Sequence, residues 1–162
     1  MNNNLLVIGV NSYNSVVLDI AKSMNVFDKI TFLNENDISS TDYQNFTKEY
    51  SWVFISIANP HKKLELQNFL MKFDYNIATL ISPSAFVASS AKIGEGTIIE
   101  PMALIHSNTV IGDGCVISAG ALIDYNVVIG KGCHIDCRST ILSDTIIAPY
   151  TKILCGSILQ RK

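Results

Sequence analysis

The sequence is poor in the features that identify several large classes of protein. Its 12 Lys and Arg residues stand against 14 Asp and Glu residues, a formal net charge of −2. No basic excess is therefore available to hold a nucleic acid. No apolar run approaches the roughly 18 residues of a membrane-spanning helix, and the start, Met1 to Asn4, lacks the basic region and cleavage site of a secretion signal. We expect a cytoplasmic protein without a nucleic-acid or membrane partner.

Residues that commonly hold metals or form disulfides are also few. The 4 cysteines contain no CxxC pair, a spacing typical of zinc sites. The spacing between Cys115 and Cys133 equals that between Cys137 and Cys155. We expect the first pair to be small buried side chains and the second pair to be free thiols, because disulfides are rare in cytoplasmic proteins. The sequence predicts no metal site.

Aromatic residues are nearly absent from the second half of the chain. Of 7 Phe, 6 Tyr and 1 Trp residues, only Tyr125 and Tyr150 lie beyond Phe86. The first half therefore has the bulky side chains that a conventional core needs, whereas the second half has mainly aliphatic ones. This shift in composition predicts two domains, residues 1–80 and residues 81–162.

The second half is an uninterrupted repeat of six residues. An aliphatic residue fills every sixth position, and a small side chain usually follows four residues later. The aliphatic series is Ile81, Val87, Ile93, Ile99, Ile105, Ile111, Ile117, Ile123, Ile129, Ile135, Ile141, Ile147, Ile153 and Leu159. A fixed short period is the signature of a β-solenoid. Each unit is one short strand and a corner, three units close a coil, and residues 18 apart stack about 4.7–4.9 Å from one another. We predict a parallel β-helix.

The first half alternates strand and helix patterns. Apolar runs at residues 5–8, 30–33, 52–57 and 77–80 read as strands, and helical spacing follows residue 15 and residue 60. Such alternation predicts an α/β domain with a small, Rossmann-like parallel sheet. Ligands of these sheets bind at the carboxyl ends of the strands. The candidate substrate-binding residues are therefore Gly9, Asn11, Ser12, Tyr13, Asn14, Asn34, Glu35 and Asn59.

The first of these turns has the order strand, glycine, turn, helix. Amides at a helix N-terminus attract anions, so a phosphate could be held there. A dinucleotide-binding fingerprint needs three glycines, and only Gly9 is present, so an ordinary strand-to-helix turn is the alternative. His61, at another strand end, either contacts a nucleotide or simply begins a helix.

Three short motifs accompany the repeat. They are Ile-Gly-Val-Asn-Ser-Tyr-Asn at residues 8–14, Ile-Ser-Ile-Ala-Asn at residues 55–59 and Ser-Pro-Ser-Ala at residues 82–85. With the hexads, they make most of the chain resemble the sugar acyltransferases of the bacillosamine and perosamine N-acetyltransferase and sialic-acid O-acetyltransferase-like type. The resemblance implies a nucleotide-sugar-binding domain followed by a left-handed β-helix. It also implies a homotrimer with active sites between neighbouring prisms, which transfers an acetyl group from acetyl-CoA to an amino or hydroxyl group of a nucleotide-linked sugar in surface glycan synthesis, without a metal.

The chain differs from the family that it resembles at functional positions. In that family the first turn usually reads Gly-x-x-Gly-His-Gly, but residues 9–14 of this chain keep only the first glycine. The family's general base is a histidine after an acidic residue; here Tyr125 follows Asp124. A phenol with a pKa of about 10 accepts a proton poorly at neutral pH. The chain also ends at Lys162, where family members usually continue. These departures favour the alternative that the chain is a catalytically silent trimeric relative serving as a binding or scaffolding subunit.

The remaining candidate residues lie in the repeats. His134 is the last residue of its hexad and is expected at a corner. It matches a second family histidine, which lies beside the acetyl thioester, so His134 and Ser143 are assigned to the binding of acetyl-CoA. The alternative is that His134 is a surface or interface histidine. His106 precedes Asp124 by three hexads, so the two either form a base and its orienting carboxylate or a paired surface group. Tyr125 either contacts the sugar or is a plain interface aromatic.

The same β-helix also carries carbonic-anhydrase-like zinc enzymes, which gather three histidines between subunits. This chain has 3 histidines in total, one of them outside the repeats. His106 and His134 occupy different positions of the hexad. We therefore expect no zinc chemistry.

Overall fold

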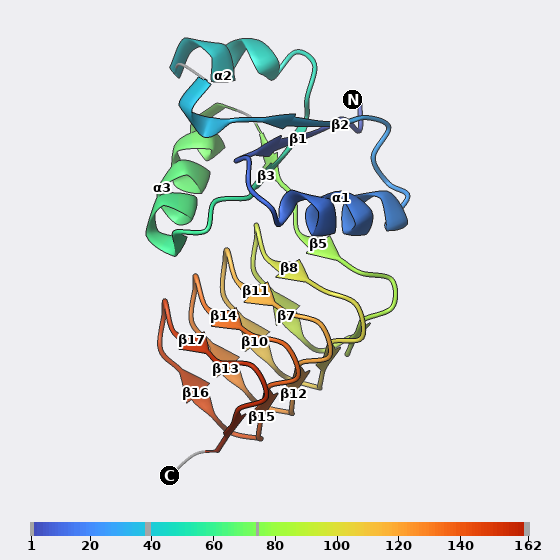
Figure 1. Cartoon of the computed structure of the whole chain (residues 1–162), viewed down its shortest axis with the longest axis vertical. Coiled ribbons are helices and arrows are strands. Elements are labelled where there is room, and N and C mark those ends of the chain that lie inside the picture. Colours follow the sequence, from blue (N-terminus) through green and yellow to red (C-terminus); the bar gives the residue numbers. More distant parts are fainter. Residues whose placement is uncertain (1, 38–39, 74, 161–162) are drawn as a thin grey trace. The chain divides into compact units, whose positions relative to one another are not determined.

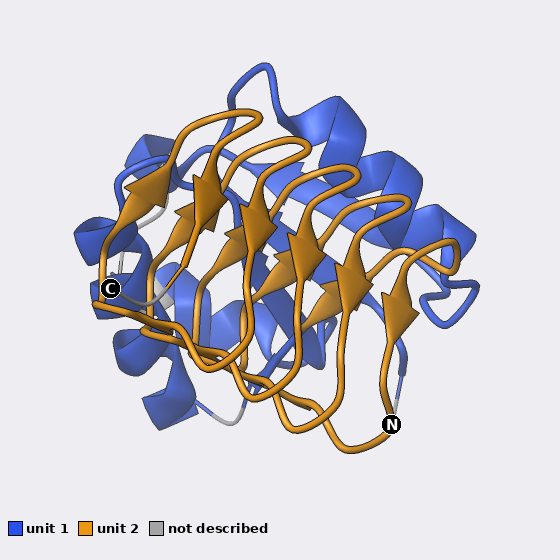
Figure 2. Cartoon of the chain, turned by 90° about the horizontal axis from the view of Figure 1, so that it is seen from below, with its two compact units in different colours: residues 1–78 blue, residues 79–162 orange. Residues whose placement is uncertain are grey.

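The structure is a computed structural model that describes residues 2–37, 40–73 and 75–160. The chain divides into two compact units, Met1–Ala78 and Thr79–Lys162, which Figure 2 shows in different colours. Each unit is described by itself. In the described part of the chain, no helix is long and apolar enough to cross a lipid bilayer.

The first unit contains a parallel sheet with helices against it. Its strands are β1 (Leu5–Ile8), β2 (Ile30–Leu33), β3 (Trp52–Ile55) and β4 (Asn76–Ile77), in the order β2-β1-β3-β4. Its helices are α1 (Asn14–Ser23), α2 (Ser40–Phe46) and α3 (Pro60–Leu70), with short 3₁₀ turns at Glu35–Asp37 and Met71–Phe73. Every strand pair is parallel.

Both faces of this sheet are buried, as expected for a parallel sheet with helices on its faces. Leu6 and Ile8 point to one face, where they join a cluster with Tyr43 of α2 and Leu70 of α3. Leu5 is also fully buried and points to the other face, because side chains alternate along a strand. Figure 1 shows α1 and α2 on opposite sides of the sheet.

The sequence patterns locate most of these elements. The first two strands have the expected bounds, whereas the third ends at Ile55, two residues early, and the last is Asn76–Ile77 rather than residues 77–80. Helix α2 was not predicted. Its residues, STDYQNF, include several that favour turns over helix. Tyr43 is buried in the cluster against the sheet, and this packing stabilises the helix.

The second unit is a stack of two-residue strands that forms three parallel sheets (Figure 1) and fits a left-handed β-helix of hexapeptide repeats. We name each sheet after one of its residues. The His134 sheet contains β5 (Leu80–Ile81), β8 (Ile98–Ile99), β11 (Val116–Ile117), β14 (His134–Ile135) and β17 (Lys152–Ile153). The Leu122 sheet contains β6 (Phe86–Val87), β9 (Leu104–Ile105), β12 (Leu122–Ile123), β15 (Thr140–Ile141) and β18 (Ile158–Leu159). The Val128 sheet contains β7 (Lys92–Ile93), β10 (Val110–Ile111), β13 (Val128–Ile129) and β16 (Ile146–Ile147).

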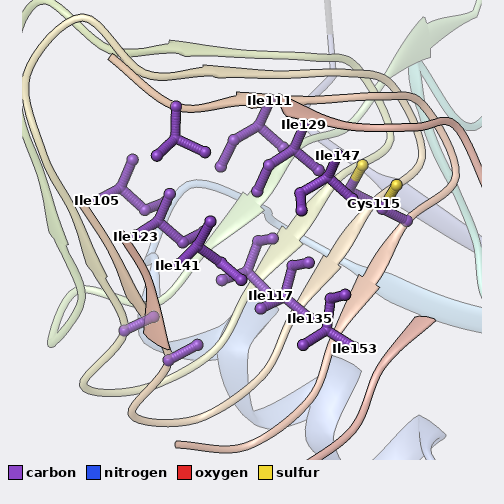
Figure 3. Packing of buried hydrophobic residues seen from close by; sticks show 14 of the residues in the cluster. Ile105, Ile111, Cys115, Ile117, Ile123, Ile129, Ile135, Ile141, Ile147 and Ile153 are labelled. Atoms are coloured by element: carbon purple, nitrogen blue, oxygen red, sulfur yellow. The ribbon is translucent and has the colours of Figure 1, made fainter. Parts of the chain in front are cut away.

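The register follows the repeat. Ile117 pairs with Ile99 on one side and Ile135 on the other, each one coil away. The second residue of each strand points inward, and Figure 3 shows these isoleucines stacked in columns inside the prism. Cys115 and Cys133 also lie in this interior, as expected, and both are free thiols.

The small residue four positions after the inward aliphatic one does more than leave space. Where it carries a hydroxyl or thiol, it often donates a hydrogen bond to a carbonyl oxygen of the next coil. The acceptors of Thr97, Thr109, Cys115, Cys133 and Ser139 are Gly112, Asp124, Gly130, Ala148 and Leu154, at 2.7–3.2 Å. These side chains therefore satisfy corner carbonyls that the strands leave unpaired.

The corners have two backbone requirements. One residue in most corners has a positive φ, as in Asn126 (59°) and Gly132 (66°). At the corner after the Val128 sheet, neighbouring coils also touch through backbone. A Cβ added to Gly112 would lie 2.6 Å from the amide nitrogen of Lys131. Only glycine fits where the backbones touch. In the Gly-x-Gly motifs at residues 94–96, 112–114 and 130–132, the first glycine permits this close approach and the last has the positive φ.

Candidate functional site

The first unit brings three strand ends together at one edge of its sheet. Gly9, after β1, has φ of 115°, and a Cβ added there would lie 2.5 Å from the carbonyl oxygen of Ser56, after β3. The amide of Gly9 also donates to the carbonyl of Leu33, at the end of β2, at 2.8 Å. Gly9 is therefore required by the close approach of protein backbone, a reason independent of any ligand.

Two asparagines lock the turn that follows Gly9. The Asn14 side chain donates to the Gly9 carbonyl and accepts from the Ser56 hydroxyl, both at 2.8 Å. Asn11 donates to the Ser56 carbonyl, and its own side-chain oxygen accepts from the amide of Tyr13 at 2.9 Å. Asn11 and Asn14, two of the predicted substrate-binding asparagines, thus have structural partners. Among the described residues, the side chain of Tyr13, the N-cap residue of helix α1, makes no capping hydrogen bond to the first turn of the helix.

The other strand ends are also internally bonded. The Asn34 side chain accepts from the amide of Asn36 at 3.0 Å, within the turn that contains Glu35. Asn59 caps α3 by accepting from the amides of His61 and Lys62 at 3.0 and 3.1 Å. His61 lies in the first turn of α3, as its alternative interpretation expected. Of the predicted residues, Ser12 is exposed and Glu35 is half-buried at this edge.

In the second unit, the predicted base position lies on the corner after the Leu122 sheet. Tyr125 is 47% exposed there, and its amide donates to the carboxylate of Asp124 at 2.8 Å. His106 stacks one coil below Asp124 in the predicted register. Among the described residues, no hydrogen bond or ion pair joins their side chains, so the two are not a formed base–orienter pair. Ser143 stacks one coil beyond Tyr125, as the strand register requires.

The backbone beside Tyr125 is held by a polar ladder. Asn108, Asn126 and Asp144 have φ of 59° and follow one another at intervals of one coil. Asn108 donates to Asn126 at 3.3 Å, and Asn126 donates to Asp144 at 3.1 Å. Asn and Asp tolerate this left-handed conformation better than other residues with side chains. The ladder fixes the corner, and the Tyr125 side chain projects from it.

His134 does not lie at a corner, which corrects the sequence expectation. It is the first residue of strand β14, where it pairs with Val116 below and Lys152 above. The first residue of each strand points out of the prism, because the second points in. His134 is half-buried, and its Nε2 lies 3.2 Å from the hydroxyl oxygen of Ser118. The imidazole is therefore held on a sheet face.

Acidic and basic groups lie near this imidazole. The pKa of Asp136 is lowered, first by the hydrogen bond from the Cys137 amide at 2.8 Å and then by the charges of His134, when its ring is protonated, and of Lys152. The Lys152 ammonium lies 3.9 Å from the Asp136 carboxylate. Glu100 is 8% exposed, and its carboxylate accepts from the Ala119 amide at 3.0 Å. The surroundings of His134 are thus polar and mixed in charge.

The histidines of the second unit do not converge. His106 follows β9 of the Leu122 sheet, whereas His134 lies in β14 of the His134 sheet. Among the described residues, no group of three or more His, Cys, Asp and Glu side chains could hold a metal ion. The geometry brings Tyr125, Asp124 and His106 to one corner and His134 to a separate face.

The sequence reasoning missed three residues that surround His134. Ser118 lies 16 residues before His134, which is two residues fewer than one coil. Asp136 follows it by two, and Lys152 stacks above it. Lys152 lies one whole coil from His134, whereas Ser118 and Asp136 do not, so a comparison of residues one whole coil apart leaves those two out.

Residues 79–124 match the family model described as bacterial transferase hexapeptide (six repeats). A comparison with curated proteins finds no match. Several solved structures are similar over nearly the whole chain. PerB from Caulobacter crescentus, solved in complex with CoA and GDP-perosamine, is 17% identical with a TM-score of 0.74, covering 96% of this chain and 90% of that one.

Two further structures have similar arrangements. The acetyltransferase domain of PglB from Neisseria gonorrhoeae, in complex with acetyl coenzyme A, is 20% identical with a TM-score of 0.66, covering 98% of this chain and 94% of that one. WeeI from Acinetobacter baumannii is 15% identical with a TM-score of 0.64, covering 96% and 93%. At these identities, the similarity establishes that this chain has the same fold.

Proposed function

We propose that this chain is an acyltransferase that moves the acetyl group of acetyl-CoA to the amino group of a nucleotide-linked sugar, in the synthesis of a surface glycan. The observation that carries the proposal is the match of both units together. The fold of PerB, solved with CoA and GDP-perosamine, covers 96% of this chain. A β-helix alone would support only a hexapeptide-repeat protein.

His134 is the residue that we assign to the acyl donor. It combines a half-buried imidazole, a fixed hydrogen bond to Ser118 and a position on a rigid sheet. A hydrogen-bond donor held near the thioester carbonyl would stabilise the negative charge that develops on its oxygen as the nucleophile attacks. Ser143 remains a proposed contact of the donor, with no observation beyond its place in the column of Tyr125.

Tyr125 favours an amine over a hydroxyl as the acceptor. A sugar hydroxyl must lose its proton as it attacks, which needs a base. A neutral amine already has a lone pair. Its nitrogen attacks the thioester carbon, the carbon–sulfur bond breaks, CoA leaves as the thiolate, and the excess proton is lost from nitrogen. A phenol in the base position is compatible with this reaction, and Asp124 and His106 stand as candidate proton acceptors nearby.

The sheet edge of the first unit is the proposed site for the nucleotide. Asn11, Asn14, Asn34 and Asn59 have structural partners, so their role in binding would be to hold backbone amides in place. The described N-cap residue of helix α1 makes no capping hydrogen bond with its side chain, and the amides at a helix N-terminus attract phosphate. The exposed Ser12 could donate to a phosphate, and Glu35 could accept from a ribose or sugar hydroxyl.

A homotrimer is part of the proposal, because two faces of the prism expose apolar side chains. Val110, Val128 and Ile146 point outward from the Val128 sheet, and Ile146 is 76% exposed. Phe86, Leu122 and Ile158 are exposed on the Leu122 sheet. Large apolar faces of this kind mark sites of protein association. Changing Ile146 to Glu should dissociate the trimer, as measured by light scattering, whereas changing exposed Lys92 to Glu on the same sheet should have a smaller effect.

A catalytically silent relative is the second candidate. The observations that favour it are the exposed phenol of Tyr125 in the base position and the lack of a hydrogen bond between the described side chains of His106 and Asp124. Such a protein would keep the fold and the assembly without turnover. It would still present the apolar faces and could bind a nucleotide sugar.

Calorimetric titration with acetyl-CoA, followed by detection of acetylated product by mass spectrometry, tests the proposal. We expect binding at micromolar donor and N-acetylation of an amino sugar nucleotide. Changing Tyr125 to His should raise the rate, since a positioned general base typically contributes about 10²–10⁴-fold, whereas Tyr125→Phe should not. Failure of acetyl-CoA to bind at millimolar concentration would refute the acyltransferase and leave the silent relative.

A further inference from the structure

The hydroxyl of Ser118 belongs to a buried side chain at a corner of the β-helix. Ser118 is 3% exposed, and its backbone is fixed by a bond from its amide to the Ile135 carbonyl at 2.9 Å. Its carbonyl accepts from the Ala121 amide at 3.1 Å. The next residue is held as well, because the Ala119 amide donates to Glu100. Ser118 therefore sits on backbone that has little freedom to move.

Within the described residues, the Ser118 hydroxyl has one side-chain partner, Nε2 of His134 at 3.2 Å. The imidazole is fixed from its own backbone too, because the His134 amide donates to the Thr151 carbonyl at 3.0 Å. Two rigid coils thus determine the contact. A hydroxyl has a single proton, and a buried donor without an acceptor is costly, whereas an unused lone pair costs less.

The direction of the hydrogen bond follows from this asymmetry. If Nε2 carried the proton, Ser118 would accept, and its own buried proton would be left without a partner. If Ser118 donates, Nε2 is the acceptor, and the neutral imidazole carries its proton on Nδ1.

We propose that Ser118 is a positioning residue that holds neutral His134 in the tautomer protonated at Nδ1, so that His134 acts as a hydrogen-bond donor and not as the general base. Its chemical part rests on the proposed function, in which the Nδ1–H group would donate to the thioester carbonyl. The tautomer itself is a property of the free protein. The assignment separates two tasks. His134 polarises the thioester carbonyl of the acetyl donor, and groups at the corner that carries Tyr125 remove the proton of the amine.

The tautomer can be measured without any turnover. Long-range ¹H–¹⁵N correlation spectra of the ¹⁵N-labelled protein distinguish Nδ1–H from Nε2–H imidazole, and His134→Gln identifies the signals of His134 among the three histidines. We expect the Nδ1–H pattern in the unmodified protein and in Ser118→Thr, which keeps the hydroxyl. Ser118→Ala should lose it and move toward a mixture. A neutral Nε2–H ring in the unmodified protein, or no change in Ser118→Ala, would overturn the proposal.

Ser139→Ala is the matched control. Ser139 is fully buried at the same edge of the prism, and among the described residues its hydroxyl lies within hydrogen-bond distance of the backbone carbonyls of Asp136 (2.7 Å) and Leu154 (2.9 Å) and of no side chain. It should reduce stability and leave the His134 spectrum unchanged. In the enzyme assay, Ser118→Ala should lower kcat about tenfold at neutral pH with a smaller change in the KM for acetyl-CoA, and Ser118→Thr should restore it.

The two failures are distinguishable. If no variant or unmodified protein transfers an acyl group, the proposed function fails, and the spectra still decide the tautomer. If the protein is active but Ser118→Ala retains both kcat and the Nδ1–H pattern, the role of Ser118 is refuted while the function stands. A loss of kcat in Ser139→Ala equal to that in Ser118→Ala would assign the effect to stability and also refute the proposal.

Discussion

Two threonines in one interior column differ only in whether their hydroxyls find a partner, and their replacement by valine should have opposite effects. Thr109 donates to the Asp124 carbonyl at 2.7 Å. Thr145 lies two coils later in the same column, and its buried hydroxyl has no hydrogen-bond partner among the described residues. Val127 lies between them, fully buried, so the column already accommodates a valine without a hydroxyl.

The magnitudes follow from this geometry. Thr109→Val removes a hydrogen bond worth about 0.5–1.5 kcal/mol and leaves the Asp124 carbonyl unpaired, for a total of about 2 kcal/mol of lost stability. Thr145→Val replaces an unsatisfied buried hydroxyl by a methyl group of the same size and should gain about 1 kcal/mol. For a chain of this length, about 2–4 °C of melting temperature corresponds to 1 kcal/mol.

Thermal unfolding followed by circular dichroism measures both changes. Protein concentration is held constant, because an oligomer melts at a concentration-dependent temperature. We expect Thr109→Val to melt about 4–8 °C lower and Thr145→Val about 2–4 °C higher than the unmodified protein. Equal destabilisation by the two substitutions would refute the idea that these side chains matter as hydrogen-bond donors to the next coil and would leave shape as their only role.

Three more predictions concern other corners. Cys155, which is exposed, should react with a maleimide first, and Cys137 should react more slowly because partial burial raises its pKa; mass spectrometry of the peptides checks the order. Asp136→Asn should make the free energy of unfolding depend less on pH in acid, because a carboxyl whose pKa is lowered in the folded state gives stability that is present above the unfolded pKa and is lost as pH falls through the folded pKa. Urea titrations between pH 3 and 6 check this, and an unchanged slope of the unfolding free energy against pH would contradict it. Gly112→Ala should cost about 1–3 kcal/mol, because its methyl group would meet the backbone of Lys131; an unaltered melting temperature would contradict this close approach.

The solenoid was predictable because its interior has one solution. An aliphatic residue at every sixth position fixes which side chains point inward, and the observed pairs Ile99–Ile117 and Ile117–Ile135 are each one coil apart, as the period requires. The period says nothing of what outward side chains touch across coils. For this reason the contact between Ser118 and His134 was missed, and His134 was expected at a corner instead of on strand β14.

The first unit was less predictable, because its local signals compete with packing. Helix α2 has no strong helical pattern, and the burial of Tyr43 against the sheet stabilises it. Gly9 and the asparagines after it suggested a ligand site by residue type alone. Their observed partners include the Ser56 carbonyl and hydroxyl, so the same residues would be needed even in a turn that binds nothing.

The division of the prism into three sheets restricts how such a chain can change its length. Deleting one hexad between Ser118 and His134 would keep the interior filled, yet it would rotate His134 into the place of Val128 on a different sheet. Deleting a whole coil of three hexads would return it to its own sheet, with Glu100 where Ser118 had been. Insertions and deletions that preserve the fold thus fall into two classes, and only whole coils leave the surface pattern aligned with its faces.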